Sequence, residues 1–78
     1  MTEKDIICCL KATLFTNSFG MYEAGNIIQP QRMQSLLKDP NYPLIIDMLE
    51  EMVSEGYVDK KDGVYTLSVY GASVLNLP

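Results

Sequence analysis

The most reactive side chains in this sequence are two adjacent cysteines, Cys8 and Cys9. Thiolates can bind zinc or respond to oxidants, but a structural zinc site takes about four Cys or His ligands. The chain has no histidine and no further cysteine, and adjacent residues do not readily meet the geometry of a disulfide. We therefore expect two free thiols in a reducing compartment, and no metal or other cofactor.

Catalytic constellations are missing from the sequence. Without histidine there is no Ser-His or Cys-His pair, and no glycine-rich stretch has the spacing of a phosphate-binding loop. No apolar stretch approaches the roughly 20 residues of a membrane-spanning helix, and the charged N-terminus does not resemble a signal peptide. We expect a cytoplasmic, non-enzymatic protein with no small-molecule substrate and no membrane association.

The remaining chemistry is that of charged surfaces that bind another macromolecule. The chain of 78 residues has ten acids and six bases, a formal net charge of −4. DNA-binding proteins usually carry a basic excess, although a local patch matters more than the sum. Two sets of residues are candidates for binding. Cations that could contact phosphate are Arg32, Lys38, Lys60 and Lys61, and carboxylates that could contact a basic partner are Asp47, Glu50 and Glu51.

The first half of the chain is expected to form two of the helices that position these charged groups. Thr2 and Asp5 resemble a capping box ahead of an amphipathic stripe, which predicts a first helix ending near residues 16–17. Pro30 suits the first position of a second helix. A very short strand is expected at Ile27 and Ile28 between them. The large apolar residues of the intervening loop either pack under it or form a dimer surface: Phe15, Phe19 and Met21.

The clearest periodicity belongs to a third helix, from Pro43 to the glycine stop at Gly56. Because residues before proline avoid the helical region, neither Asp39 nor Tyr42 is expected to be helical. The apolar half of the helical wheel should face the core: Leu44, Ile45, Met48, Leu49, Met52 and Val53. The outward half holds Ile46, Asp47, Glu50, Glu51, Ser54 and Glu55.

The C-terminal third contains a hairpin signal followed by a short helix. Residues 57–60 and 64–67 alternate like strands around Asp62-Gly63, a dipeptide typical of tight hairpins. A last helix is expected at roughly residues 69–75. The order predicts one α+β, mainly α domain over residues 1–78. It has a three-helix core, a two-stranded β-hairpin wing and a short C-terminal helix, which is the winged helix-turn-helix plan.

Two stretches also resemble the winged-helix family in sequence. Residues 48–58 contain an apolar helix stripe, then Gly56, then an apolar strand. Residues 65–75 resemble the Tyr-x-Leu-Thr/Ser-x-x-Gly-x-x-x-Leu signature of small bacterial regulators in the multiple-antibiotic-resistance and phenolic-acid-decarboxylase families. In that signature Ser68 caps a helix, Gly71 permits close packing and Leu75 returns to the core.

The resemblance implies DNA binding and transcription regulation, with the third helix in the major groove and the wing on the backbone. It places groove-facing residues at Asn41, Tyr42, Asp47, Glu50, Glu51 and Ser54, and wing contacts at Lys60 and Lys61. The sequence departs from the family pattern because the exposed half of the third helix carries acids and no Lys or Arg. Phosphate neutralisation supplies most DNA affinity, so this departure weakens the implied function.

Two functions therefore stay open. The first is a DNA-binding regulator, expected to be a homodimer, that uses Arg32, Lys38, Asn41, Tyr42, Lys60 and Lys61. The second is a protein-interaction module on the same scaffold that does not bind DNA and docks a partner on Asp47, Glu50, Glu51 and Ser54. A continuous positive strip joining the four cations would favour the first function, and its absence would favour the second.

Overall fold

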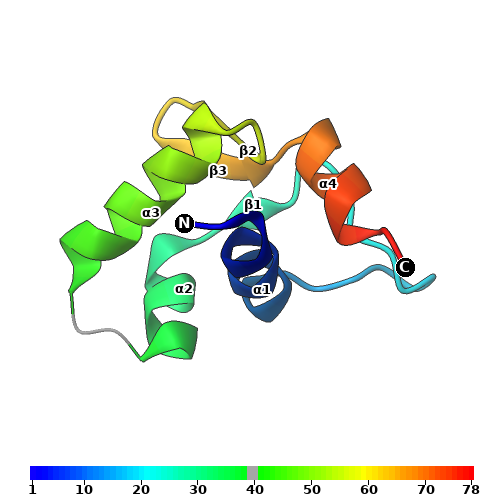
Figure 1. Cartoon of the computed structure of the whole chain (residues 1–78), viewed down its shortest axis with the longest axis horizontal. Coiled ribbons are helices and arrows are strands. Elements are labelled where there is room, and N and C mark those ends of the chain that lie inside the picture. Colours follow the sequence, from blue (N-terminus) through cyan, green and yellow to red (C-terminus); the bar gives the residue numbers. More distant parts are fainter. Residues whose placement is uncertain (39–40) are drawn as a thin grey trace.

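The computed structural model describes residues 1–38 and 41–78, and within them four helices surround a three-stranded antiparallel sheet (Figure 1). The protein is thus α+β and mainly helical, an arrangement compatible with the layout expected from the sequence. The elements in chain order are α1 (Glu3–Thr13), β1 (Ile27–Ile28), α2 (Pro30–Leu37), α3 (Tyr42–Ser54), β2 (Val58–Lys61), β3 (Val64–Leu67) and α4 (Val69–Leu75).

Helix α1 begins with the expected capping box. The Thr2 hydroxyl accepts the Asp5 amide and the Asp5 carboxylate accepts the Thr2 amide, so two otherwise unpaired donors are satisfied. The helix ends at Thr13, earlier than predicted, because Leu14 turns to an extended conformation while its side chain stays in the core. The Thr13 carbonyl, one of the orphaned acceptors of the last turn, takes a hydrogen bond from Arg32 Nε at 2.9 Å.

Helices α2 and α3 both have a proline in their first turn. Pro30 is the first residue of α2, as predicted, and Lys38 ends that helix in the left-handed region with φ 54°. Helix α3 begins at Tyr42, so the expectation of a non-helical Tyr42 is wrong. The steric bias against helical geometry before proline is overcome at Tyr42, and Pro43 costs the helix no hydrogen bond because the N–H groups of a first turn have no partner within the helix. The related expectation for Asp39 lies outside the described residues.

The inward face of α3 is rotated relative to the predicted one. Ile45, Leu49 and Met52 are fully buried, as expected. Leu44, predicted to face inward, is 42% exposed, and Ile46, predicted to face outward, packs partly against the core. The helix contacts α2 on one side and β2 on another, and these two neighbours set a rotation that the helical wheel alone does not determine.

The sheet has the strand order β1-β3-β2, so β1 and β2 are its edges. The predicted hairpin is confirmed, with Val58 opposite Leu67 and Lys61 opposite Val64. Asp62 and Gly63 connect the strands with φ of 52° and 77°, as a two-residue turn with both central residues left-handed requires. The short strand at Ile27–Ile28 is also confirmed and pairs with β3.

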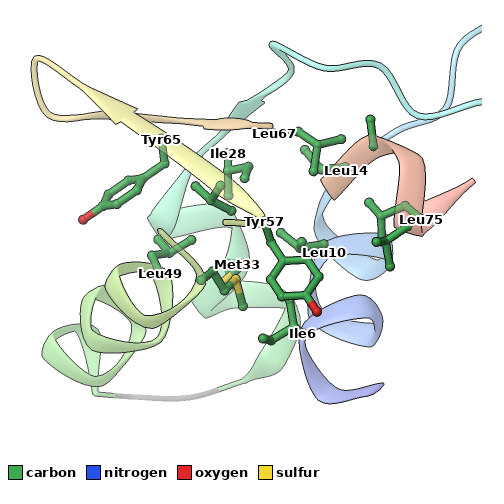
Figure 2. Close-up of a cluster of buried hydrophobic side chains, with 14 of the residues drawn as sticks. Ile6, Leu10, Leu14, Ile28, Met33, Leu49, Tyr57, Tyr65, Leu67 and Leu75 are labelled. Atoms are coloured by element: carbon green, nitrogen blue, oxygen red, sulfur yellow. The ribbon is translucent and has the colours of Figure 1, made fainter. Parts of the chain in front are cut away.

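The core lies where α1, α2 and α3 meet the inner face of the sheet (Figure 2). Ile6 and Leu10 of α1, Met33 of α2, Leu49 of α3 and Ile28 of β1 are each at most 1% exposed. Helix α4 closes one end of this core. Ser68 caps it through the Gly71 amide, and Gly71 and Leu75 are buried, so the expected roles of these three residues are confirmed.

Candidate macromolecular interface

The two hairpin lysines lie on opposite faces of the sheet. Lys60 is opposite the buried Tyr65, whereas Lys61 is opposite the exposed Val64. Successive strand residues point to opposite faces, so Lys60 turns towards α3 and Lys61 towards the outer face. The pleat of β2 therefore separates the two lysines expected at the wing, and contact of either with DNA stays a prediction.

The Lys60 side chain is held by a small polar cluster, which also contains Glu50 and Tyr65. Its ammonium forms an ion pair with the Glu50 carboxylate and lies 5.3 Å from the centre of the Tyr65 ring. The Tyr65 hydroxyl donates to the same carboxylate oxygen at 3.0 Å. No pattern in the sequence indicates this contact of Tyr65 with α3, because it depends on the tertiary arrangement.

This cluster perturbs the titration of all three groups. Hydrogen bonds from Lys60 and then Tyr65 lower the pKa of Glu50. The bond to Glu50 raises the pKa of Lys60, and burial followed by the same carboxylate raises the pKa of Tyr65. Each shift favours an ionised Glu50 and Lys60 at neutral pH, so the positive charge of Lys60 is matched by a carboxylate of the same molecule.

Arg32 is directed to the end of α1. Its Nε donates to the Thr13 carbonyl, and its guanidinium stacks 4.4 Å from the centre of the Phe15 ring. Lys38 caps α2 on the surface. Two of the four candidate cations, Arg32 and Lys60, are thus held by groups of the same molecule, and Lys60 and Lys61 lie on opposite faces of the sheet.

The two polar residues of the expected DNA-binding set, Asn41 and Tyr42, lie at the start of α3. Asn41 is the N-cap residue of α3, although its side chain makes no capping hydrogen bond. Tyr42 is the first residue of that helix, and its side chain lies outside the described part of the structure. The proximity of Tyr42 to a ligand therefore stays a prediction.

The predicted acidic face is carried on α3. Asp47 is exposed, and the Ser54 hydroxyl is turned back to the Glu51 carbonyl at 2.9 Å. The Glu51 carboxylate accepts the N-terminal amine of Met1 at 3.1 Å, and Glu50 belongs to the cluster with Lys60. The residues that α3 spans contain three acids and no Lys or Arg. The four expected residues thus share one helix, but two of their carboxylates have partners within the molecule.

The loop after α1 leaves large apolar groups uncovered. Phe15 is 71% exposed and Phe19 87%, and Met21 is also exposed, so core packing, one of the two alternatives for these residues, is wrong. Phe15 borders an open pocket of about 350 Å³ between the end of α1 and β1. Its lining consists of Thr13, Leu14, Phe15, Asn26, Ile27, Gln29 and Arg32. These residues come from three separate segments, and no local pattern in the sequence marks them.

The cysteines are free thiols, with Cys8 exposed and Cys9 partly buried. Burial raises the pKa of the Cys9 thiol, which lowers its reactivity as a nucleophile. Within residues 1–38 and 41–78, no three His, Cys, Asp or Glu side chains are grouped so that they could hold a metal ion. Among the described helices, none combines the length and apolar content needed to cross a membrane.

Compared with protein-family models, with curated proteins and with solved structures, the chain shows no match to any of them.

Proposed function

We propose that this chain is a winged-helix protein-interaction module that docks a basic segment of another protein on the outward face of α3. The observation that carries the proposal is the pairing of Lys60 with Glu50. The hairpin lysine nearest to α3 is neutralised within the molecule, and the helix itself contributes acids without any Lys or Arg.

Charge arithmetic supports a basic partner on this face. The carboxylates of Asp47, Glu50 and Glu51 lie on one helix; Lys60 balances Glu50 and the N-terminal amine of Met1 balances Glu51, so Asp47 keeps an unbalanced negative charge. A DNA phosphate approaching the helix would meet the Asp47 carboxylate. Phosphate contacts by Lys and Arg supply most of the affinity of DNA-binding proteins, and a surface of this sign repels phosphate. A Lys/Arg-rich segment would instead be attracted and oriented by it.

A second candidate, a DNA-binding regulator, is favoured by the order of the elements. A helix pair, α2 and α3, precedes a hairpin, and Lys38 and Lys61 remain on the surface. In this proposal α3 would lie in the major groove and Lys61 would contact the backbone. Lys60 would first have to leave Glu50, its partner within the molecule, which lowers the affinity that it could supply.

Binding of two labelled probes, followed by fluorescence anisotropy, distinguishes the candidates. The probes are a Lys/Arg-rich peptide and a random-sequence DNA duplex, both at low salt. We expect the peptide to bind with an affinity that falls as salt rises, and the duplex not to bind. Duplex binding that is weakened by Lys61→Ala would instead establish the second candidate.

A pair of charge reversals localises the peptide. Asp47→Lys on α3 should abolish peptide binding, because it reverses the charge of an exposed side chain in the proposed face. Asp59→Lys in β2 changes the net charge by the same amount, but Asp59 is exposed opposite Thr66, on the outer face of the sheet. Equal effects of the two variants would show that the peptide responds only to net charge, and the proposed face would be wrong.

A further inference from the structure

Strand β1 has a free hydrogen-bonding edge. It is an outer strand of the sheet, and Leu67 N–H donates to the Asn26 carbonyl at 2.9 Å. Alternate residues of a strand bond to a given neighbour, so the next residue, Ile27, directs its own N–H and C=O away from β3. Within residues 1–38 and 41–78, no hydrogen bond occupies these two groups.

This edge opens into the pocket beside α1. The pocket is lined by Ile27 and its neighbours Asn26 and Gln29 but by no residue of β3, which places it on the open side of β1. Phe15 forms the opposite wall. Ile27 is 61% exposed and Phe15 71%, so an extended chain lying along β1 would cover two large apolar side chains that water now contacts.

The pocket also has a positively charged wall. Arg32 Nε is bonded to the Thr13 carbonyl, and the guanidinium lies against Phe15, so the side chain is fixed at two points. Among the described residues, none accepts a hydrogen bond from the two Nη groups, and no acid lines the pocket. A planar guanidinium held in this way is suited to a carboxylate, which it can bind through two parallel hydrogen bonds.

We propose that this pocket binds an extended segment of a partner protein, which adds to β1 as a further strand. The segment's backbone bonds to the N–H and C=O of Ile27. One apolar side chain packs on Phe15 and Ile27, and an Asp or Glu two positions along the added strand, on the same face, binds Arg32. Main-chain hydrogen bonds give affinity in such strand addition, and the side-chain contacts give specificity.

Charge identifies the occupant as another protein rather than a second copy of this chain. Pairing of two β1 strands would bring residues near Ile27 of one copy beside those of the other. Residues 24–38 contain no Asp or Glu, and Glu23, the acid just before them, already accepts a hydrogen bond from Asn17 at 2.7 Å, so neither copy offers the other's Arg32 an unengaged carboxylate from this segment. The proposal uses neither Asp47 nor any other part of the acidic face of α3, so it stands independently of the proposed function.

Selection from a displayed library of random linear peptides tests the proposal. Enriched sequences should contain an apolar residue two positions from an Asp or Glu, and the synthesised peptides should bind the full chain in solution. Ile27→Pro removes the outward-facing N–H at an edge position that tolerates proline. We expect it and Arg32→Gln each to weaken peptide binding about tenfold or more, because each removes a hydrogen bond to a peptide group.

Controls keep the result specific to this edge. Ile27→Val retains the amide and an apolar side chain and should retain binding, and Asp47→Lys should leave binding unchanged while it abolishes the docking proposed for α3. If Arg32→Gln unfolds the protein, an NMR titration of the unaltered chain tests the same contact. The amide resonance of Ile27 should then shift when the peptide is added. The proposal is overturned by a selection that yields no binder, by binding indifferent to Ile27→Pro, or by self-association that Ile27→Pro abolishes.

Discussion

Replacement of Gly71 by alanine should destabilise the protein strongly, although alanine is the better helix former. A Cβ at this position in α4 would lie 2.2 Å from the Tyr57 carbonyl oxygen and 2.9 Å from Leu67 Cδ1. Carbon–oxygen contacts normally lie at about 3.3–3.6 Å, so the backbone would have to move by roughly 1 Å. The displaced carbonyl also accepts the Ser68 amide at 3.1 Å, and that bond would be strained with it.

The two competing effects have opposite signs, which makes the experiment decisive. Alanine in place of glycine in a helix interior gains about 1 kcal/mol from propensity. Overpacking costs about 1–3 kcal/mol or more, and disturbing the buried hydrogen bond adds about 1 kcal/mol. We expect a net loss of about 1–3 kcal/mol, centred on about 2 kcal/mol, out of the roughly 4–12 kcal/mol typical of a protein of this length.

Urea unfolding followed by circular dichroism measures this loss as a lower midpoint at an unchanged slope. At about 4–8 °C per kcal/mol, the melting temperature should fall by roughly 10 °C or more. Ser73→Ala, at an exposed position of the same helix, should stay within about 0.5 kcal/mol of the unaltered protein. A Gly71→Ala protein as stable as the original, or more stable, would refute the close approach of α4 to the hairpin.

Two further substitutions test the polar contacts. Ser68→Ala removes a hydroxyl that accepts the Gly71 amide and donates to the Gly56 carbonyl at 2.6 Å. The free energy of unfolding should fall by about 1–2 kcal/mol. The control Ser54→Ala, at an exposed position, should change it very little. Glu50→Gln tests the cluster with Lys60 and Tyr65: because the folded-state pKa of Glu50 is lowered, its ionised form stabilises the fold at neutral pH, and that contribution is lost as the pH falls through the lowered pKa. Unfolding measured from neutral to acidic pH should therefore show a smaller loss of stability for Glu50→Gln, and equal pH profiles would contradict the cluster.

Local patterns were sufficient to predict the elements. The Thr2 capping box, Pro30, the Asp62-Gly63 turn and the Ser68 cap each depend on residues within one turn of one another. The structures that these residues form could therefore be predicted from the sequence. The same is true of the alternation of Val64–Leu67 and of the buried positions Ile45, Leu49 and Met52, where periodicity follows directly from backbone geometry.

Tertiary structure decided which groups meet. The pleat of β2 separates Lys60 from Lys61, and only the packing of the sheet against α3 brings Lys60 to Glu50. Likewise, Phe15, Ile27 and Arg32 belong to separate segments and line one pocket only when α1 ends at Thr13 and β1 takes the sheet edge. Such side-chain contacts depend on how each helix is rotated about its axis and on how each strand is paired. The whole core sets both, because the apolar faces of the helices and of the sheet must be buried against one another together.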